Sequence, residues 1–343
     1  MKLLITGGNG NISHYCTQQA LNLGHDVYIL NRGLTSATRR DVPRGVTSLS
    51  ADLKNPCDTK RALSDHYFDC IIDFLCYDEK DARNAFDLFA GICAHYIFIS
   101  SVTAYQRITK SLPYTEESKK LESSEYEYAY NKVLAEYFFM EKYSKSGFPV
   151  TIVRPAHTYD TIVPVSIGHN CFTAPQRFLE GKPVLIAGDG TNLWTLTHSK
   201  DFAAALMGLV TNKDCIGQDF HITSDEWLTW LEITHFLLDA LDLNIAESEW
   251  IHIPVNRILN MHVPPSSNMS ISYLGKAFRG QRMWCDIYDN SKIKKFVPGW
   301  EAKTQFQFGI KETITWLYEN SVRIRINDQL SQLMDQLADE FSP

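Results

Sequence analysis

Short apolar runs alternate with longer amphipathic stretches through the first half of the chain. The runs predict strands at Lys2–Thr6, Val27–Asn31, Val46–Leu49, Cys70–Phe74, Tyr96–Ser100 and Val150–Val153. The stretches between them have helix-like composition or helical spacing and predict helices at Ile12–Leu23, Asp58–Ser64, Glu79–Cys93 and Tyr126–Tyr143. Because the strand runs are apolar without alternation, we expect both faces of each strand to be buried. The order of elements predicts right-handed βαβ units on a doubly wound parallel sheet.

The pattern changes after Val153. Residues 161–175 are irregular, and the helices predicted beyond them are Pro175–Leu179, Phe202–Leu209 and Thr229–Leu241. The tail Thr304–Phe341 predicts two polar-faced helices, joined near Asn327 and packed on the outside of the sheet. We therefore expect an α/β protein. Its Rossmann-type domain covers residues 1–160, with segments near 196–220 and 286–297 returning to it, and a smaller C-terminal α/β substrate lobe covers 161–343.

Composition and charge exclude several classes of protein. The 343 residues are 44% hydrophobic and 21% charged, as in globular proteins of two-domain size. The 33 basic and 40 acidic residues give a net charge of -7, which makes nucleic-acid binding an unfavoured function. No run approaches roughly 18 apolar residues and no signal-peptide core precedes the glycines, so we expect no membrane contact and a cytoplasmic location. The eight cysteines are scattered without a Cys-x-x-Cys pair, so we expect no metal site and no disulfide framework.

A glycine-rich turn directly follows the first predicted strand and precedes a helix. Gly7 and Gly10 permit a tight turn and let backbone N–H groups approach a pyrophosphate at the helix N-terminus. The alternative is an ordinary structural turn. Its position at the first strand–helix junction of a βαβ series favours a dinucleotide loop, with Gly7, Gly10, Asn11 and Ile12 as the cofactor contacts and the small Ser13 packing beneath.

The end of the second predicted strand indicates which dinucleotide binds. NAD-specific sites commonly place a carboxylate there on the adenine ribose, whereas this sequence has Asn31-Arg32-Gly33, with Arg39 and Arg40 nearby. A guanidinium suits a 2′-phosphate, although an exposed arginine is also common at such a position. The sequence predicts NADP through Arg32, with NAD as the second choice.

Hydroxyl groups end the fifth predicted strand, at the sheet edge where open α/β sheets bind ligands. After Ser101 at this edge, Tyr128 and Lys132 follow on one helix, four residues apart and on one face. An adjacent ammonium stabilises a phenolate and lowers the pKa of a tyrosine, so such a pair can move a proton. The helix also carries Tyr126, Tyr130 and Tyr137, and an aromatic stripe is often core packing. The hydroxyl-ended strand and the glycine turn favour catalysis by Ser101, Tyr128 and Lys132.

Five segments together resemble the extended branch of the short-chain dehydrogenase/reductase superfamily, which contains NAD-dependent nucleotide-sugar epimerases and dehydratases. They are TGGNGNIS, Asp52-Leu53, ISSVTAY, Tyr128-x-x-x-Lys132 and Arg154-Pro155-Ala156-His157-Thr158-Tyr159, and the resemblance covers about residues 1 to 300. It implies that Asp52 and Leu53 contact the adenine and that Leu75 and Cys76 line the dinucleotide. Many relatives pair through the helix that holds the tyrosine and the lysine, which implies a homodimer.

The resemblance also implies catalytic roles. Ser101 would polarise the substrate oxygen, Tyr128 would be the general acid/base, and Lys132 would hold the nicotinamide ribose while depressing the tyrosine pKa. In the dehydratases of this branch an Asp–Glu pair follows the hydroxyl residue, but here Val102 and Thr103 stand there. Valine cannot exchange a proton, so dehydration is disfavoured and reduction, oxidation or epimerisation remains.

The second departure concerns the part of the site that holds the substrate. Trp194 stands where an arginine commonly grips a substrate diphosphate, and an indole offers one donor and no charge. Either the substrate lacks a nucleotide diphosphate or another cation replaces the arginine, the candidates being Arg177, Lys182, Arg279 and Arg282. The predicted substrate contacts are Thr103, His157 and Trp194. His198 is a further candidate, although a structural role is the more common fate of a single histidine.

The sequence therefore predicts an NADP-dependent oxidoreductase or epimerase that acts on a hydroxyl or carbonyl carbon of a small molecule such as a sugar or sugar nucleotide. The alternative is a catalytically silent protein on the same fold. One such protein would bind RNA, as the chloroplast stem-loop RNA-binding proteins of an atypical subgroup do, and another would sense NADP(H) for a protein partner. The net charge argues against RNA, and the set of Ser101, Tyr128 and Lys132 argues against lost chemistry.

Overall fold

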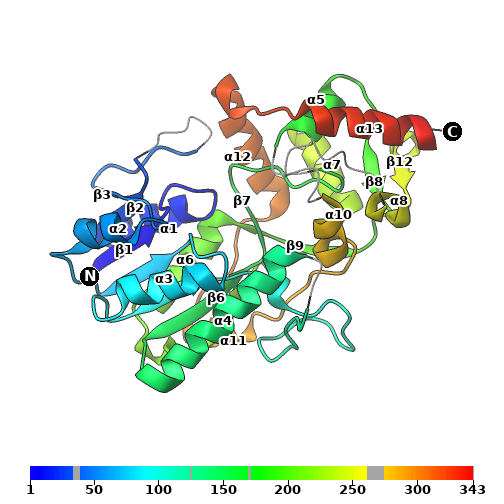
Figure 1. Ribbon diagram of the computed structural model, residues 1–343. Coiled ribbons are helices and arrows are strands. Elements are labelled where there is room, and N and C mark those ends of the chain that lie inside the picture. Colours follow the sequence, from blue (N-terminus) through cyan, green and yellow to red (C-terminus); the bar gives the residue numbers. More distant parts are fainter. Residues whose placement is uncertain (34–38, 124–125, 169–170, 261–273, 343) are drawn as a thin grey trace.

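A seven-stranded parallel sheet forms the centre of the computed structural model, which describes residues 1–33, 39–123, 126–168, 171–260 and 274–342 (Figure 1). The strand order is β10-β6-β5-β4-β1-β2-β3, and every neighbouring pair is parallel. The strands are β1 (Lys2–Thr6), β2 (Asp26–Asn31), β3 (Thr47–Ser50), β4 (Cys70–Asp73), β5 (Tyr96–Ile99), β6 (Val150–Pro155) and β10 (Asp219–Ile222). The order reverses between β1 and β4, which confirms the predicted doubly wound sheet and places its ligand-binding edge there.

Helices cover both faces of this sheet. One face carries α1 (Ser13–Asn22), α6 (Ser199–Val210) and α11 (Ser291–Phe296), and the other carries α2 (Pro56–Leu63), α3 (Glu79–Phe89) and α4 (Glu127–Ser146). Successive strand residues point to opposite faces, so Leu3 and Ile5 belong to the first core and Leu4 to the second. This two-sided burial explains the unbroken apolar runs in the sequence.

Local backbone chemistry sets the helix ends. α3 stops at Phe89, short of the predicted end at Cys93, where the chain turns through Gly91 with a φ of 83°. α4 continues past its predicted end to Ser146, and Gly147 closes it in the left-handed conformation, with a φ of 69°. Glycine adopts this conformation without the penalty that a side chain would bring.

The C-terminal lobe has two small sheets. Strands β7 (His157–Tyr159), β9 (Leu193–His198) and β11 (Trp227–Thr229) form one, and β8 (Leu185–Ala187) and β12 (Ile251–Ile253) form the other. The lobe helices are α5 (Thr173–Leu179), α7 (Trp230–Ala240), α8 (Val255–Leu259), α10 (Leu274–Ala277), α12 (Phe306–Tyr318) and α13 (Asp328–Phe341). Short helical turns are η1 (Val102–Ala104), η2 (Lys213–Cys215), η3 (Glu247–Glu249), η4 (Phe278–Arg282) and η5 (Ser321–Arg323).

The tail helices do not pack on the outside of the large sheet as predicted. Instead α12 and α13 lie beside the other helices of the lobe (Figure 1). They bury apolar residues such as Ile310 and Leu337 in the core of the lobe. α12 lies against α7, and α13 lies against α5 and β12. A polar-faced helix needs only one apolar surface to cover, and the sequence could not tell which surface that is.

Within the described ranges, no helix combines the length and the apolarity that a membrane span requires. Five cysteines are buried, Cys171 and Cys285 are half-buried and Cys57 is exposed.

Candidate active site

Two adjoining compartments lie along the carboxyl ends of β1, β2, β4 and β5. The small compartment has a volume of about 300 Å³ and the large compartment about 480 Å³. Gly7, Arg39, Leu75 and Tyr77 line both, so the compartments meet at the glycine turn. This is the edge at which an open parallel sheet binds its ligands.

The glycine turn has a shape that fits a pyrophosphate. Gly7 has a φ of 67°, a conformation that favours glycine, and a Cβ atom there would lie 3.0 Å from the Leu75 side chain, which would have to shift. Ser13 closes the turn from beneath, accepting a hydrogen bond from the Gly10 N–H at 2.8 Å and donating one to the Gly7 carbonyl at 2.5 Å. α1 begins at Ser13, so its positive end faces the large compartment.

Asn11 lines the large compartment, but its side chain is engaged within the protein. Its Nδ2 donates to the Thr158 carbonyl at 2.8 Å, and its Oδ1 accepts from the Thr161 N–H at 2.9 Å. The asparagine thus ties the loop to the end of β7. Together with the neighbouring Ile12, it can offer backbone rather than side-chain groups to a ligand.

The small compartment contains the residues predicted at the adenosine end. Arg32, Asp52 and Leu53 line it, together with Arg39. Arg40 does not join them, because its guanidinium forms two hydrogen bonds with Asp160, at 2.8 and 2.5 Å. Arg40 therefore binds the residue that follows β7 and does not line the small compartment with Arg32.

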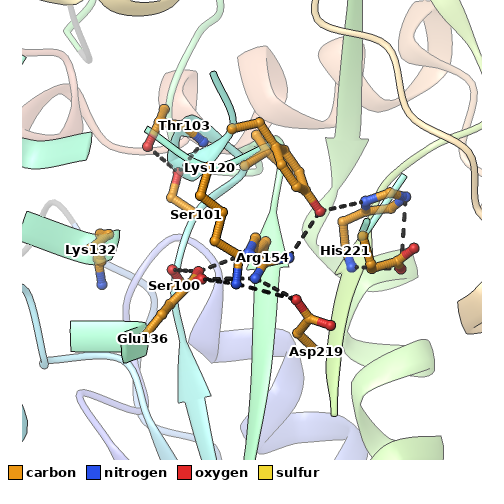
Figure 2. A network of polar contacts seen from close by, with 12 residues as sticks. Ser100, Ser101, Thr103, Lys120, Lys132, Glu136, Arg154, Asp219 and His221 are labelled. Atoms are coloured by element: carbon orange, nitrogen blue, oxygen red, sulfur yellow. Dashed lines mark hydrogen bonds and ion pairs between the residues drawn. The ribbon is translucent and has the colours of Figure 1, made fainter. Parts of the chain in front are cut away.

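Ser101, Thr103 and Tyr128 meet on the wall of the large compartment. Ser101 caps the short turn η1, where its Oγ accepts hydrogen bonds from the Thr103 N–H at 3.2 Å and from the Thr103 hydroxyl at 2.9 Å (Figure 2). The phenol of Tyr128 lines the same compartment, and the Ser101 side chain acts to lower the pKa of this phenol. A phenol and a second hydroxyl thus face one space with the glycine turn.

Lys132 lies behind this group of side chains. Its buried Nζ donates to the carbonyls of Cys76 at 2.6 Å and Ile99 at 2.9 Å, and it lies 6.0 Å from the centre of the Tyr128 ring. Burial raises the pKa of Tyr128 above its ordinary value, and the Ser101 side chain opposes that rise. Burial also lowers the pKa of Lys132. That Lys132 holds the nicotinamide ribose and lowers the pKa of Tyr128 stays a prediction.

A buried ionic network supports the end of β5 (Figure 2). Glu136 accepts two hydrogen bonds from Arg154, at 2.7 and 2.8 Å, and one from the Ser100 hydroxyl at 2.6 Å. Arg154 also donates to Asp219 at 2.6 Å, and Lys120 lies 3.1 Å from Glu136. Sequence reasoning missed Glu136. Its place on α4, one helical turn after Lys132 and on the buried side of the helix, was a usable signal. Through Ser100, the network holds the end of β5 next to Ser101.

The predicted substrate contacts divide into two groups. Thr103 and His157 line the large compartment. Trp194 does not, because it is fully buried, donates its indole N–H to the Trp284 carbonyl at 3.1 Å and packs against Trp230. Its prediction as a substrate contact is wrong, since the pairing of β9 turns its side chain into the lobe core behind His157.

The other cations proposed in place of an arginine grip are mostly structural. Arg177 and Lys182 both bind Asp335 of α13, at 2.7 and 3.1 Å. Arg282 donates to the Val165 carbonyl at 2.9 Å, and Arg279 lines a separate cavity beyond Tyr126.

His198 has a structural role as well. It caps α6 by accepting the Lys200 N–H at 3.1 Å, and burial lowers its pKa to about 4. Three residues that sequence reasoning missed, Tyr77, Tyr126 and Gln281, line the large compartment without belonging to any motif.

A comparison with protein families decides the classification. The sequence model of the NAD dependent epimerase/dehydratase family matches residues 3–222. The chain belongs to this family. Membership confirms the resemblance read from the sequence motifs, and the matched region contains the glycine turn, Ser101, Tyr128 and Lys132.

Proteins that are similar to this chain differ in their described activity. A 2′-dehydrokanamycin reductase of Streptomyces kanamyceticus is 28% identical over 245 residues, which are 70% of this chain and 67% of the reductase. The chloroplast stem-loop binding protein of 41 kDa b of Arabidopsis thaliana is 23% identical over 239 residues, 67% of this chain and 60% of that protein. A solved epimerase of Methanothermobacter thermautotrophicus superimposes with a TM-score of 0.72 at 15% identity over 94% of both chains, which shows a shared fold.

Proposed function

We propose that the protein is an NADP-dependent oxidoreductase or epimerase that acts on a hydroxyl or carbonyl carbon of a sugar-like small molecule. The main support is that Ser101 and Tyr128 line the same compartment as the glycine turn. Family membership supports a nicotinamide dinucleotide as the cofactor. Gly7, Gly10, Asn11 and Ile12 would hold its pyrophosphate, and when bound it would supply the hydride donor or acceptor.

The protein's own groups would manage the proton. Tyr128 gives its phenolic proton to the substrate oxygen when a carbonyl is reduced, and it takes a proton back when an alcohol is oxidised. The Ser101 hydroxyl stabilises the oxyanion that develops in either direction. Lys132 has a positioning role, because it binds the Cys76 and Ile99 carbonyls and so fixes the two chain segments beside the compartment. Val102 offers no acid or base, which favours these reactions over dehydration.

The proposed substrate lacks a nucleotide diphosphate. A diphosphate favours charge-assisted forks from arginine, and Arg177 and Lys182 are engaged by Asp335 while Trp194 is buried. The similarity to a reductase named for 2′-dehydrokanamycin, whose name describes a glycoside without a nucleotide, points in the same direction. We therefore propose a keto-glycoside or its alcohol as the substrate class.

Turnover with matched variants tests the reaction. The purified protein is incubated with NADPH and a panel of keto-glycosides that includes 2′-dehydrokanamycin, with UDP-glucose as the nucleotide-linked comparator, and the loss of NADPH absorbance is followed. Tyr128→Phe is expected to lose about 10²- to 10⁴-fold in turnover on an accepted substrate. Tyr137→Phe is the control, since this tyrosine is 53% exposed on the same helix. Turnover by Tyr128→Phe within a few-fold of wild type would refute the assignment.

Binding measurements test the preference for NADP. Arg32 lines the small compartment and offers a charged fork for a 2′-phosphate, so we expect NADPH to bind at least about tenfold more tightly than NADH. Arg32→Ala should remove most of that difference and leave NADH affinity unchanged. Equal or tighter binding of NADH by the wild type would contradict the proposal.

RNA binding is the second candidate, because the chloroplast stem-loop binding protein is among the relatives. Filter binding to a structured RNA at physiological salt, recorded as a function of salt, discriminates it from the enzyme. Tight, salt-dependent retention without turnover would favour this candidate. The homodimer and the cytoplasmic location stay predictions, and sedimentation of the full chain tests the first of them.

A further inference from the structure

The charged side chains along the two compartments are unevenly distributed. The small compartment is lined by Arg32, Arg39, Lys54 and three aspartates. Among the described residues that line the large compartment, Arg39 is the single lysine or arginine, and no aspartate or glutamate accompanies it. An anion that enters the large compartment can therefore pair with the permanent positive charge of Arg39 and meets no carboxylate of the described lining.

Arg39 lies at the junction of the two compartments, because it lines both of them together with Gly7. A nicotinamide dinucleotide has an adenosine half and a nicotinamide half, joined by a pyrophosphate with a negative charge on each phosphate. When the adenosine occupies the small compartment and the nicotinamide half the large one, the pyrophosphate is the part that crosses the junction. The arginine and the charged bridge of the dinucleotide thus belong to the same place.

We propose that the guanidinium of Arg39 binds the pyrophosphate of the cofactor, while Arg32 binds the 2′-phosphate. The inference rests on the proposed function, in which a nicotinamide dinucleotide is the cofactor. It separates two arginines that the sequence placed together near the adenine ribose, and it gives each of them a different phosphate.

The hydrogen bonds within the glycine turn show why a side chain is needed there. The Gly7 N–H donates to the Leu30 carbonyl at 2.9 Å, and the Gly10 N–H donates to the Ser13 hydroxyl oxygen at 2.8 Å. These two glycines therefore offer a pyrophosphate space for close approach, while their N–H groups are used within the protein. The positive end of α1 supplies partial charge at this place, and Arg39 supplies a full one.

The neighbouring residue fixes the backbone next to Arg39. Arg40 donates to Asp160 at 2.8 and 2.5 Å, and its guanidinium carbon lies 5.2 Å from the centre of the Tyr15 ring and 5.1 Å from that of Trp316. Tyr15 is in the first turn of α1, so this part of the chain lies beside the helix end that follows the glycine turn. The side chain of Arg39 is exposed, but its starting point is held, which lowers the cost of ordering it on a ligand.

The two arginines should differ in the ligands that they distinguish. A planar guanidinium binds phosphate oxygens through parallel, charge-assisted hydrogen bonds. The pyrophosphate is common to NADH and NADPH, so the loss of Arg39 should weaken both by the same factor. The 2′-phosphate is present only in NADPH, so the loss of Arg32 should weaken NADPH alone.

Calorimetric titration of the full-length chain measures these differences. The ligands are NADH, NADPH and ADP-ribose, which keeps the pyrophosphate and lacks the nicotinamide. The variants are Arg39→Ala, Arg39→Lys, which keeps the charge and loses the fork, and Arg32→Ala. Arg44→Ala is the matched control, because Arg44 is exposed on the same segment and lines neither compartment.

We expect Arg39→Ala to weaken the binding of all three ligands by about tenfold, and Arg39→Lys by about threefold, because a point charge replaces part of the interaction. Arg44→Ala should bind each ligand as the wild type does. An NADH affinity of Arg39→Ala within about twofold of wild type would overturn the proposal. A loss at least about tenfold larger for NADPH than for NADH would overturn it as well, because Arg39 would then bind the 2′-phosphate.

This measurement separates the inference from the proposed function. ADP-ribose can neither give nor accept a hydride, so its binding does not depend on turnover. An absence of turnover across the glycoside panel would refute the proposed function and leave the result for Arg39 valid. A wild-type protein that binds none of the three ligands would overturn both.

Discussion

Replacing Glu136 by glutamine tests the importance of the buried ionic network beneath the active site. The carboxylate has no exposed surface, and its partners are Arg154, Ser100 and Lys120. Breaking a buried pair on one side typically costs about 3–5 kcal/mol, because a charge stays buried without compensation. Arg154 keeps Asp219 at 2.6 Å, so we expect the lower end, about 3 kcal/mol of unfolding free energy.

The difference in stability between wild type and Glu136→Gln should depend on pH. Burial by itself would raise the pKa of Glu136, but Arg154, Lys120 and the Ser100 hydroxyl outweigh it and hold the pKa below the ordinary value of 4.5. A depressed carboxyl pKa stabilises the folded state above the unfolded-state pKa, and this stability is lost as the pH falls through the folded-state value. The advantage of wild type over Glu136→Gln should therefore be constant near neutral pH and shrink below about pH 4.5.

Urea unfolding followed by tryptophan fluorescence at several pH values measures both effects. Glu141→Gln is the matched control, because this residue lies on the same helix, exposed and paired only with lysine on the surface, and it should leave unfolding unchanged. A loss below about 1 kcal/mol near neutral pH, or a loss that does not depend on pH, would refute the reasoning.

Three further changes test other parts of the structure. Gly7→Ala should weaken NADPH binding by at least about tenfold in a fluorescence titration, because it combines a φ of 67° with a contact at 3.0 Å to Leu75, whereas Gly24→Ala, with nothing within 4 Å, should bind normally. Arg40→Ala should lower the unfolding free energy, measured in urea, by about 2 kcal/mol, because the buried carboxylate of Asp160 loses this partner. A change in NADPH affinity of more than about twofold would contradict the structural role of Arg40. Burial raises the pKa of Glu116 from 4.5 to about 7, so the unfolding free energy should fall by about 3 kcal/mol as the pH rises from 4.5 to 7. In Glu116→Gln this dependence of the unfolding free energy on pH should disappear.

The architecture was largely predictable, because consecutive apolar residues in a strand indicate that both of its faces are buried. β1 and β4 are apolar at consecutive positions, since Leu3 and Leu4 enter different cores, and this pattern requires helices on both sides. The lobe was less predictable. β7, β8 and β11 have three residues each, too few for a periodic pattern, and their partners are distant in the chain.

The residues of the candidate site also include some that the sequence predicted and some that it did not. Gly7, Ser101 and Tyr128 were recognised because their chemistry depends on residue type at a fixed distance from a strand or helix end. Trp194 was misplaced, because the direction of its side chain depends on the pairing of β9 with β11 and β7. The partner of Arg40 lies 120 residues away in the sequence, and no local pattern indicates such a contact.

The sequence by itself determined the doubly wound sheet, the glycine turn and the identity of the hydroxyl groups at the sheet edge, because period, propensity and spacing act locally. Only the tertiary structure decided where each charge and each proton is directed. It gave the ammonium of Lys132 to two backbone carbonyls and the hydroxyl of Thr103 to Ser101. Hydrogen bonds act over about 3 Å and depend on direction, so they are set only when distant segments of the chain have packed together.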